Sequence, residues 1–255
     1  KEKYLGSEIP KNIKDIEKVF KKEIQDDIND KLERIKDNFQ SEWKNIPDSV
    51  RKKELEEISI AFTYNTNAIE GSTITLEETR EIIREGISPN KSLRDVRETE
   101  AHSKIFLAML NKKELVSNEL LLKWHKEMFY ETKEDIAGQY REYLVRVGPY
   151  LAPDWQEVKE KMNELIDFIK NNKKMNPVEL SARAHYKFEK IHPFGDGNGR
   201  IGRLIINQIL WHAGYPMIII EYKKRKSYYK ALQKDEDGFV SYFLRRYFSV
   251  HKKRS

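Results

Sequence analysis

The sequence predicts an all-α fold, a helical bundle that carries one β-hairpin and an N-terminal helical extension. Apolar residues recur at steps of three and four through most of the 255 residues, and capping residues stand where helices would begin and end. Only residues 138–153 depart from this pattern, because β-prone residues near period two lie there between Gly and Pro. We therefore expect one strand pair within an otherwise helical chain.

The first element is one long helix or helical hairpin over about residues 13–46. Its apolar residues form one face and its charges lie elsewhere, so this face must dock on another part of the protein. Pro47 ends the element and marks the one boundary that the composition suggests. We expect residues 1–47 to form the helical extension and residues 48–255 to form the main domain.

The next elements are helices whose starts are marked by caps. Helical spacing continues from about residue 50 to residue 70, where Gly71 offers a C-cap. Three further helix starts are predicted by side chains that can accept a backbone N–H of the first turn: Thr75, Ser92 and Ser117. Thr75 also forms a predicted capping box with Glu78.

Helices resume after the predicted strand pair. We expect them at about residues 155–170, at 177–191 with Pro177 in the first turn, and at 198–213, with two shorter helices after Lys223.

Composition excludes several classes of function. The chain has no Cys, so disulfides, thiolate nucleophiles and cysteine-rich zinc sites are excluded, and any bound metal must use oxygen or imidazole ligands. Lys and Arg (48) exceed Asp and Glu (42) by six, which indicates a mixed, solvated surface. Because no stretch has the roughly 20 apolar residues of a membrane helix and no signal-peptide core opens the sequence, we expect a cytoplasmic protein.

Residues 192–203, HPFGDGNGRIGR, carry the clearest chemistry and lie between two predicted helices. His192 precedes a proline and should end the first helix, while three nearby glycines let backbone N–H groups approach a ligand. The N-terminus of the following helix adds unpaired N–H groups, and this arrangement favours phosphate. Arg200 and Arg203 share a face of that helix and can both approach the anion.

Asp196 is the one acidic residue of this basic segment. A carboxylate beside phosphates is explained if it holds Mg²⁺, which commonly binds one carboxylate together with phosphate oxygens and waters. The alternative on shape alone is a glycine-rich turn in which Asp196 acts as a cap.

Residues 192–203 match the Fic-family signature, His-any-Phe-any-acid-Gly-Asn-Gly-Arg-any-any-Arg, at every defining position. The chain resembles Fic proteins over about residues 60–248. This resemblance implies a Fic-type helical bundle with the motif between two central helices and a β-hairpin flap upstream. It also implies transfer of AMP from ATP to a Ser, Thr or Tyr hydroxyl of a target protein, with release of pyrophosphate.

The resemblance gives each motif residue a role. His192 is implied to be the catalytic base that takes the hydroxyl proton, and Asp196 to hold Mg²⁺ against the phosphates. The remaining motif residues are implied to bind the phosphates through backbone N–H groups or charge: Gly197, Asn198, Gly199, Arg200 and Arg203. Fic proteins that act as kinases carry Lys where this chain has Gly199, whereas UMP and phosphocholine transfer stay open from the motif alone.

Residues 66–71, TNAIEG, resemble the Fic inhibitory motif, Ser/Thr-any-any-any-Glu-Gly/Asn. By itself the pattern equally describes a helix end with Gly at its C-cap. In the family such a glutamate, here Glu70, pairs with the second motif arginine, here Arg203, and denies the γ-phosphate its partner. We expect self-inhibition that ends when Glu70 is removed. In some relatives the same glutamate helps to remove AMP from the modified target.

Two further segments resemble nucleotide-binding parts of Fic proteins. Val147 and Gly148 resemble the flap, whose edge aligns a target segment beside the nucleotide by strand addition. Tyr228 and Tyr229 resemble the tyrosine pair that packs near the adenine, and a pair of core residues is the alternative.

The leading prediction is thus a protein adenylyltransferase that uses ATP and Mg²⁺, docks a target protein on its flap and modifies itself. The main alternative is an ATP-sensing regulatory module that recruits a partner through its N-terminal helices. These helices can also pack on the core or join two copies as a homodimer. The basic tail, residues 251–254, suggests nucleic-acid binding, a function that would not need the intact motif.

Overall fold

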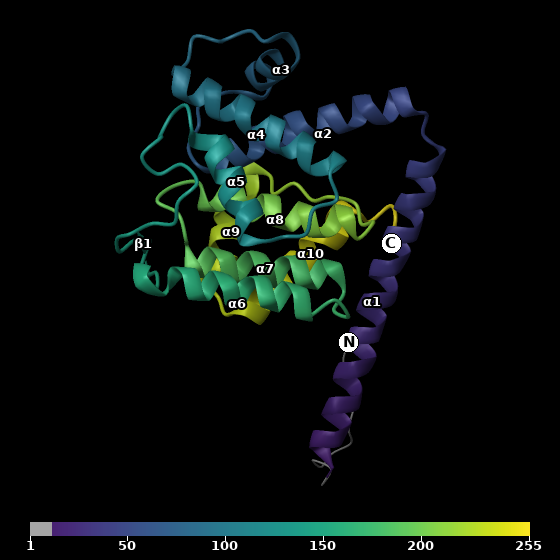
Figure 1. Cartoon of the computed structure of the whole chain (residues 1–255). Coiled ribbons are helices and arrows are strands. Elements are labelled where there is room, and N and C mark those ends of the chain that lie inside the picture. The colour runs from purple at the N-terminus through teal and green to yellow at the C-terminus, as the bar shows by residue number, and fades with distance from the viewer. Residues whose placement is uncertain (1–11) are drawn as a thin grey trace.

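The fold is almost entirely helical in the computed structural model, which describes residues 12–255 (Figure 1). The described residues form ten α-helices, two short 3-10 helices and one two-stranded hairpin, which confirms the predicted fold class. The α-helices are α1 (Ile13–Asn45), α2 (Asp48–Ile69), α3 (Leu76–Glu85), α4 (Leu93–Asn111), α5 (Asn118–Phe129), α6 (Val158–Asn171), α7 (Pro177–Ile191), α8 (Asn198–His212), α9 (Arg225–Leu232) and α10 (Glu236–Val250). The 3-10 helices are η1 (Trp155–Glu157) and η2 (Tyr222–Lys224). Residues 1–11, the start of the predicted extension, lie outside the described residues.

Helices α7 and α8 form the centre of the bundle, and α6 and α10 pack on α7 while α2 and α4 pack on α8 (Figure 1). Helix α8 is buried on nearly all sides, because most of its residues are apolar and its few polar side chains find partners inside the protein. The loop that joins α7 to α8 is residues 192–197, so the predicted phosphate-binding segment begins at the middle of the bundle.

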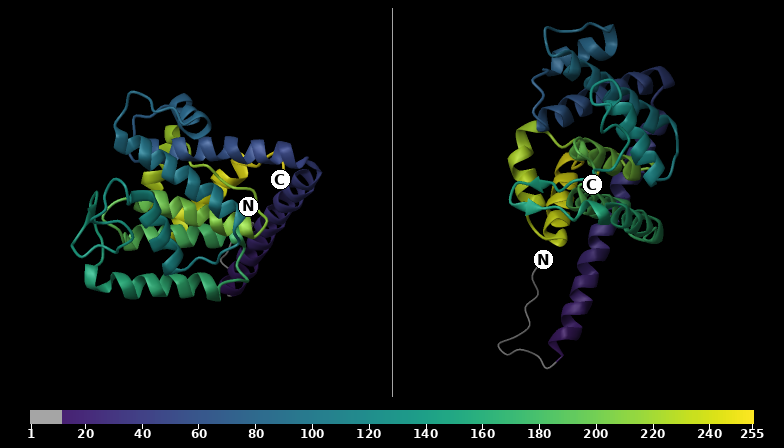
Figure 2. Two further views of the ribbon diagram at one scale, coloured as in Figure 1. Left: turned by 45° about the horizontal axis from the view of Figure 1, so that its top comes forward. Right: turned by 60° about the vertical axis from the view of Figure 1, so that its left-hand side comes forward.

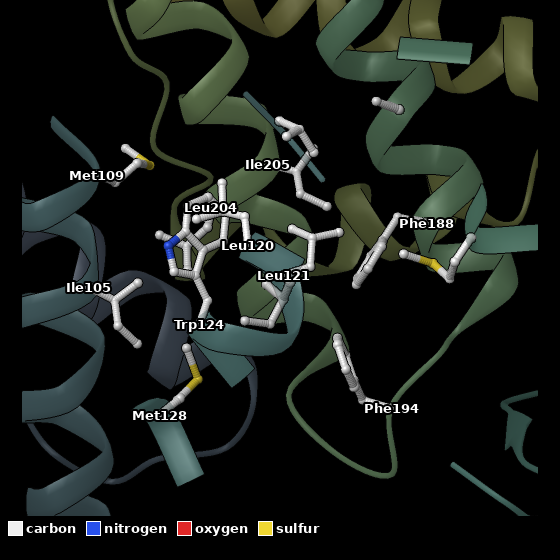
Figure 3. Packing of buried hydrophobic residues seen from close by; sticks show 14 of the residues in the cluster. Ile105, Met109, Leu120, Leu121, Trp124, Met128, Phe188, Phe194, Leu204 and Ile205 are labelled. Carbon is white, nitrogen blue, oxygen red and sulfur yellow. The ribbon is translucent and has the colours of Figure 1, made fainter. Parts of the chain in front are cut away.

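Two apolar clusters hold the bundle together. The first joins α4, α5, α6, α7 and α8, and it includes Phe194 from the central loop (Figure 3). Figure 3 shows the Phe194 ring directed from the loop toward Phe188 of α7. The second joins α1 to α7, α8, α9 and α10. Since Phe194 is fully buried, the loop is anchored in the first cluster.

Helix α1 is a single helix of 33 residues, not a hairpin. Its C-terminal half docks on the second cluster through Leu32 and Ile35, which are fully buried, and its Phe39 ring lies 6.1 Å from the Trp211 ring of α8. Its N-terminal turns extend beyond the body of the protein (Figures 1 and 2). Pro47 separates α1 from α2, as predicted.

The predicted helix starts are confirmed by their caps. Thr75 and Glu78 form both hydrogen bonds of the capping box, at 3.2 and 2.7 Å. Ser92 and Ser117 each accept a backbone N–H of the first helical turn. Helix α2 differs, because Pro47 is its N-cap and no side chain caps it.

The predicted strand pair within residues 138–153 is confirmed, but its strands are much shorter than that segment. Only β1 (Arg146–Val147) and β2 (Tyr150–Leu151) pair, antiparallel, at the tip of this segment. The chain before and after this tip is irregular because the Arg141 side chain bonds the carbonyl groups of Tyr143 and Pro153, both at 2.7 Å. A side chain thus takes carbonyl groups that a longer ladder would need.

None of the helices within residues 12–255 is long and apolar enough to cross a membrane.

Candidate active site

The loop between α7 and α8 is closed by hydrogen bonds within the motif. Asn198 accepts from the backbone N–H of Phe194 at 2.9 Å and donates to its carbonyl at 2.8 Å. His192 ends α7 with a left-handed backbone (φ 51°), the only non-glycine residue of the described chain with positive φ. This strained conformation turns the chain sharply out of α7 and persists because the loop is held on both sides.

His125 of α5 packs against the loop between α7 and α8. Its ring stacks on Phe194 at 3.9 Å, its Nε2 lies 3.1 Å from the carbonyl oxygen of Asp196, and its Nδ1 accepts the backbone N–H of Gly138 at 2.9 Å. Burial lowers the pKa of His125 to about 4, so the ring is neutral at pH 7 and donates through Nε2. These contacts give His125 a structural role in holding the loop.

The candidate base, His192, is held through its backbone. Arg141 donates from Nε to the His192 carbonyl at 2.9 Å, and its own backbone N–H bonds the carbonyl of Pro193 at 2.9 Å. The Nδ1 atom of His192 is buried and has no hydrogen-bond partner among residues 12–255. Burial, and secondarily the charge of Arg141, lower the pKa of His192, so the ring is neutral and able to accept a proton at pH 7.

Asp196 lies in a cluster of charges that includes residues outside the motif. Its Oδ2 is 2.5 Å from Nζ of Lys133, and its Oδ1 accepts the N–H of Gly197 at 2.5 Å. Burial by itself would raise the pKa of Asp196, but the Lys133 hydrogen bond and the Arg200 charge outweigh it and lower that pKa. The carboxylate is therefore ionised and already paired.

Glu98 of α4 links this cluster to the first motif arginine. Its carboxylate accepts from Nη1 of Arg200 at 2.5 Å and from Nζ of Lys133 at 2.9 Å. Burial opposes ionisation of Glu98, yet the two cations lower its pKa below the ordinary value. Arg200 is thus fixed by an acid that no motif contains.

Arg203 is buried, with 2% of its side chain exposed, and it contacts α2. Its Nε donates to Oγ1 of Thr66 at 2.6 Å, and its Nη2 donates to the Glu70 carboxylate at 2.6 Å. Burial alone would lower the pKa of Arg203, but the Glu70 charge raises it, so the guanidinium stays charged. We call this contact the Glu70–Arg203 pair. The Nη1 atom of Arg203 has no hydrogen-bond partner among residues 12–255, so one donor group of the guanidinium is unpaired.

Gly199 lies in the first turn of α8, next to the Glu70–Arg203 pair. A Cβ atom added at residue 199 would collide with the Glu70 carboxylate and approach Nη1 of Arg203 to 2.9 Å. Only glycine lets the Glu70 carboxylate approach the start of α8 so closely. A small polar pocket of about 160 Å³ opens beside it, and its lining includes Glu70, Arg94, Glu98, Lys133, Asp196 and Arg200.

The predicted flap residues lie at the hairpin tip. Val147 pairs with Tyr150 in the hairpin and is 39% exposed, and Gly148 has a φ of 58°, which the tight turn requires. Tyr150 ties the hairpin to α7 by donating to the carbonyl of Lys190 at 3.1 Å.

The two predicted adenine-stacking tyrosines have different surroundings. Tyr228 is 1% exposed and hydrogen-bonded to His185 at 2.7 Å, which matches the alternative that it is a core residue. Tyr229 is half-exposed and donates to the carbonyl of Ile69, next to Glu70, at 3.2 Å. A stacking role stays a prediction, and Tyr229 is the exposed member of the pair.

Sequence reasoning missed three residues that organise the site: Glu98, Lys133 and Arg141. All three are charged side chains in segments rich in charge, so nothing in their local pattern marked them. Each is recognisable only through a partner 50 or more residues away in the chain.

No group of three or more His, Cys, Asp or Glu side chains within residues 12–255 is arranged to hold a metal ion. Asp196 provides a single carboxylate at the polar pocket. That donor set fits Mg²⁺ only when phosphate oxygens and waters supply the remaining ligands.

Comparison with known proteins places this geometry in a family. The Fic/DOC family model matches residues 115–210. The chain is 33% identical over 201 residues to the protein adenylyltransferase Fic of Nematostella vectensis, covering 76% of this chain and 47% of that protein. It is 31% identical over 212 residues to the protein adenylyltransferase fic-1 of Caenorhabditis elegans, covering 80% of this chain and 42% of that protein. The chain therefore spans less than half the length of these curated relatives.

Solved structures share the fold. Fic-1 of C. elegans superposes with a TM-score of 0.75 at 28% identity, over 91% of this chain and 72% of that chain. A Fic-domain signalling protein of Bacteroides thetaiotaomicron superposes with a TM-score of 0.77 at 24% identity, over 88% and 95% of the two chains. The matched helices and loop, the complete motif and these relatives together show that the chain belongs to the Fic/DOC family.

Proposed function

We propose that this protein is a self-inhibited protein adenylyltransferase, which transfers AMP from ATP to a hydroxyl side chain of a target protein. The observation that carries the proposal is the neutral, strained His192 at the start of the loop that leads into the N-terminus of α8. Relatives at 30% identity or more are named protein adenylyltransferases, which supports the same activity.

In the proposed reaction the hydroxyl oxygen of the target attacks the α-phosphorus of ATP. His192 takes the hydroxyl proton, a bond forms between that oxygen and phosphorus, and the bond from phosphorus to the bridging oxygen of pyrophosphate breaks. Positioned proton transfer of this kind is typically worth about 10²–10⁴ in rate. The start of α8 and the two motif arginines would stabilise the charge on the phosphates.

Asp196 is the residue that would hold Mg²⁺, which supplies positive charge to the phosphate oxygens when bound. The polar pocket that Asp196 faces also contains Arg200, so both groups can act on one phosphate chain.

The Glu70–Arg203 pair supports self-inhibition, because Thr66 and Glu70 occupy the Nε and Nη2 donors of Arg203 and the Glu70 carboxylate would repel a γ-phosphate placed beside them. Two unit charges 4 Å apart attract by about 4 kcal/mol at an effective dielectric of 20, before the cost of desolvation. Removal of AMP from a modified target, assisted by Glu70, belongs to the same proposal.

The exposed edge of the hairpin is the proposed docking place for a segment of the target protein. A Fic domain of similar fold, IbpAFic2, has been solved in complex with adenylylated Cdc42, with a TM-score of 0.55 at 16% identity over 90% of this chain and 76% of that chain. The location of the protein and its assembly into homodimers stay predictions.

The test is to incubate wild type, Glu70→Gly and Glu70→Gly/His192→Ala with ATP and Mg²⁺ and to measure intact masses. We expect an added AMP mass on Glu70→Gly, a weak or absent one on wild type, and none on the double variant. Nucleotide binding without mass gain on any variant, even with a cell lysate as a source of targets, would favour the ATP-sensing module instead.

A further inference from the structure

Lys133 lies where a metal ion would bind Asp196. Its Nζ is 2.5 Å from Oδ2 of Asp196, and its side chain is only 13% exposed. Residue 133 follows α5 and lies outside the motif of residues 192–203, so the motif assigns it no role.

Both oxygens of Asp196 are already in use. Oδ1 accepts from Gly197 and lies 3.5 Å from Nη2 of Arg200, while Oδ2 bonds Lys133 and lies 3.9 Å from Nη2 of Arg94. A Mg²⁺ ion binds a carboxylate oxygen at about 2.0–2.1 Å. Such an ion on Oδ2 would meet the ammonium at close range, and like charges at that distance repel strongly.

Lys133 has a second partner to which it can withdraw. Oε1 of Glu98 lies 2.9 Å from the Lys133 Nζ. The Glu98 carboxylate also accepts a hydrogen bond from Arg200 and one from the Thr132 hydroxyl, the latter at 3.2 Å. If Lys133 leaves Asp196, it therefore stays paired and its charge stays compensated. The aromatic face of Phe129 lies 4.5 Å from the same ammonium and gives it a further favourable contact.

We propose that Lys133 occupies the metal position in the protein without nucleotide and competes with the divalent cation for Asp196. Lys133 is in this sense a positioning residue that sets how much Mg²⁺ the nucleotide complex requires. The proposal rests on the proposed function, since it assumes that nucleotide phosphates and a divalent cation bind beside Asp196.

The test measures metal affinity and not turnover. Mn²⁺ serves as the probe, and its binding is followed by electron paramagnetic resonance in the presence of α,β-methylene-ATP, which cannot donate AMP. The proteins are Glu70→Gly, Glu70→Gly/Lys133→Met and the matched control Glu70→Gly/Lys104→Met. Lys104 lies on α4, is exposed, and its loss removes the same charge away from Asp196.

We expect Lys133→Met to bind Mn²⁺ about three- to tenfold more tightly than Glu70→Gly alone, and Lys104→Met to leave the affinity unchanged. Equal or weaker Mn²⁺ binding by Lys133→Met would overturn the proposal. If Lys133→Met does not fold, Lys133→Gln replaces it, because glutamine keeps a hydrogen bond to Asp196 and removes only the charge.

The two proposals fail differently. If the analogue does not bind to Glu70→Gly at all, the nucleotide site itself is absent, and the proposed function falls together with the role of Lys133. If the analogue binds and the Mn²⁺ affinities of all three proteins are equal, only the role of Lys133 is refuted.

Discussion

At the scale of single residues, the site depends on buried charges that have few partners. Arg203 is the clearest case, since its guanidinium is almost fully buried and the Glu70 carboxylate is its one acidic hydrogen-bond partner within residues 12–255. Breaking a buried ion pair by removing one partner is costly, because the remaining charge is left uncompensated. When Glu70 is removed, the uncompensated guanidinium of Arg203 is the place where a phosphate would be most stabilised.

Glu70→Gly should therefore lower the stability of the nucleotide-free protein and increase the stabilisation that bound nucleotide gives. Because the Glu70 side chain is 31% exposed, we expect a loss of about 1–3 kcal/mol and not the full cost of a buried pair. Thermal unfolding with and without ATP should show a lower Tm for the variant and a larger rise on adding ATP than in wild type. An equal rise in both proteins would mean that Glu70 does not restrict the phosphate site.

The pH dependence of transfer should report His192. A base acts in its neutral form, so the rate rises with pH as the base loses its proton. Since burial lowers the pKa of His192, the midpoint should lie below 6.5. Single-turnover rates of Glu70→Gly between pH 4.5 and 8 would check this, with far-UV circular dichroism to confirm folding at each pH. A midpoint above 6.5 would contradict a buried neutral His192.

At the scale of elements, one arginine connects the hairpin to the motif loop. Arg141 donates to the carbonyl groups of Tyr143, Pro153 and His192. These bonds explain why the region is irregular although its sequence is rich in β-prone residues: the tertiary contact overrides local propensity. The helix starts behave in the opposite way, since a cap such as Thr75 with Glu78 acts over three residues and is readable from the sequence.

Replacing Arg141 by Lys should loosen the hairpin, because lysine cannot reach several carbonyl groups with a planar fork of donors. Each buried carbonyl left unsatisfied costs about 1–3 kcal/mol. We expect lower stability in urea unfolding and faster hydrogen exchange over residues 141–153. Arg146→Lys, an exposed change on β1, is the control and should stay near wild type. Unchanged exchange in Arg141→Lys would show that other contacts hold the hairpin.

At the scale of the whole molecule, burial dominates the behaviour of the histidines. All six have a pKa below the ordinary value, with burial as the largest cause in each. The pKa falls to about 4 in His125 and His251 and to about 3 in His185. His251 lies in the basic tail, whose Arg254 bonds Glu42 of α1 at 2.7 Å, so the tail packs on the protein and offers less free charge to nucleic acid than its sequence suggests.

Stability should fall when the pH is lowered from about 6.5 to 4.5. In this range the unfolded histidines bind protons that the folded ones exclude, so each contributes a loss of up to about 1.4 kcal/mol per pH unit. Glu189 opposes this trend, because burial raises its pKa to about 7 and the folded protein holds its proton as the pH falls. The destabilising effect of the six histidines exceeds the opposite effect of this one glutamate, so the net result is a loss of stability.

Urea unfolding at pH 7.5, 6.5, 5.5 and 4.5 would measure this dependence. His251→Gln, which removes one buried histidine near the C-terminus, should reduce the slope of stability against pH. A flat profile in wild type would show that these histidines take up protons without unfolding.

The amino-acid sequence by itself determined the fold class, the helix starts and the Fic motif, because each depends on residues close together in the chain. Spacings of three and four, caps such as Ser117, and the motif around His192 are all local. Only the tertiary structure decided the contacts of Lys133 and Arg141, whose partners lie on other elements. In a sequence this rich in charge, each charged side chain has many available partners, and packing of the helices selects among them.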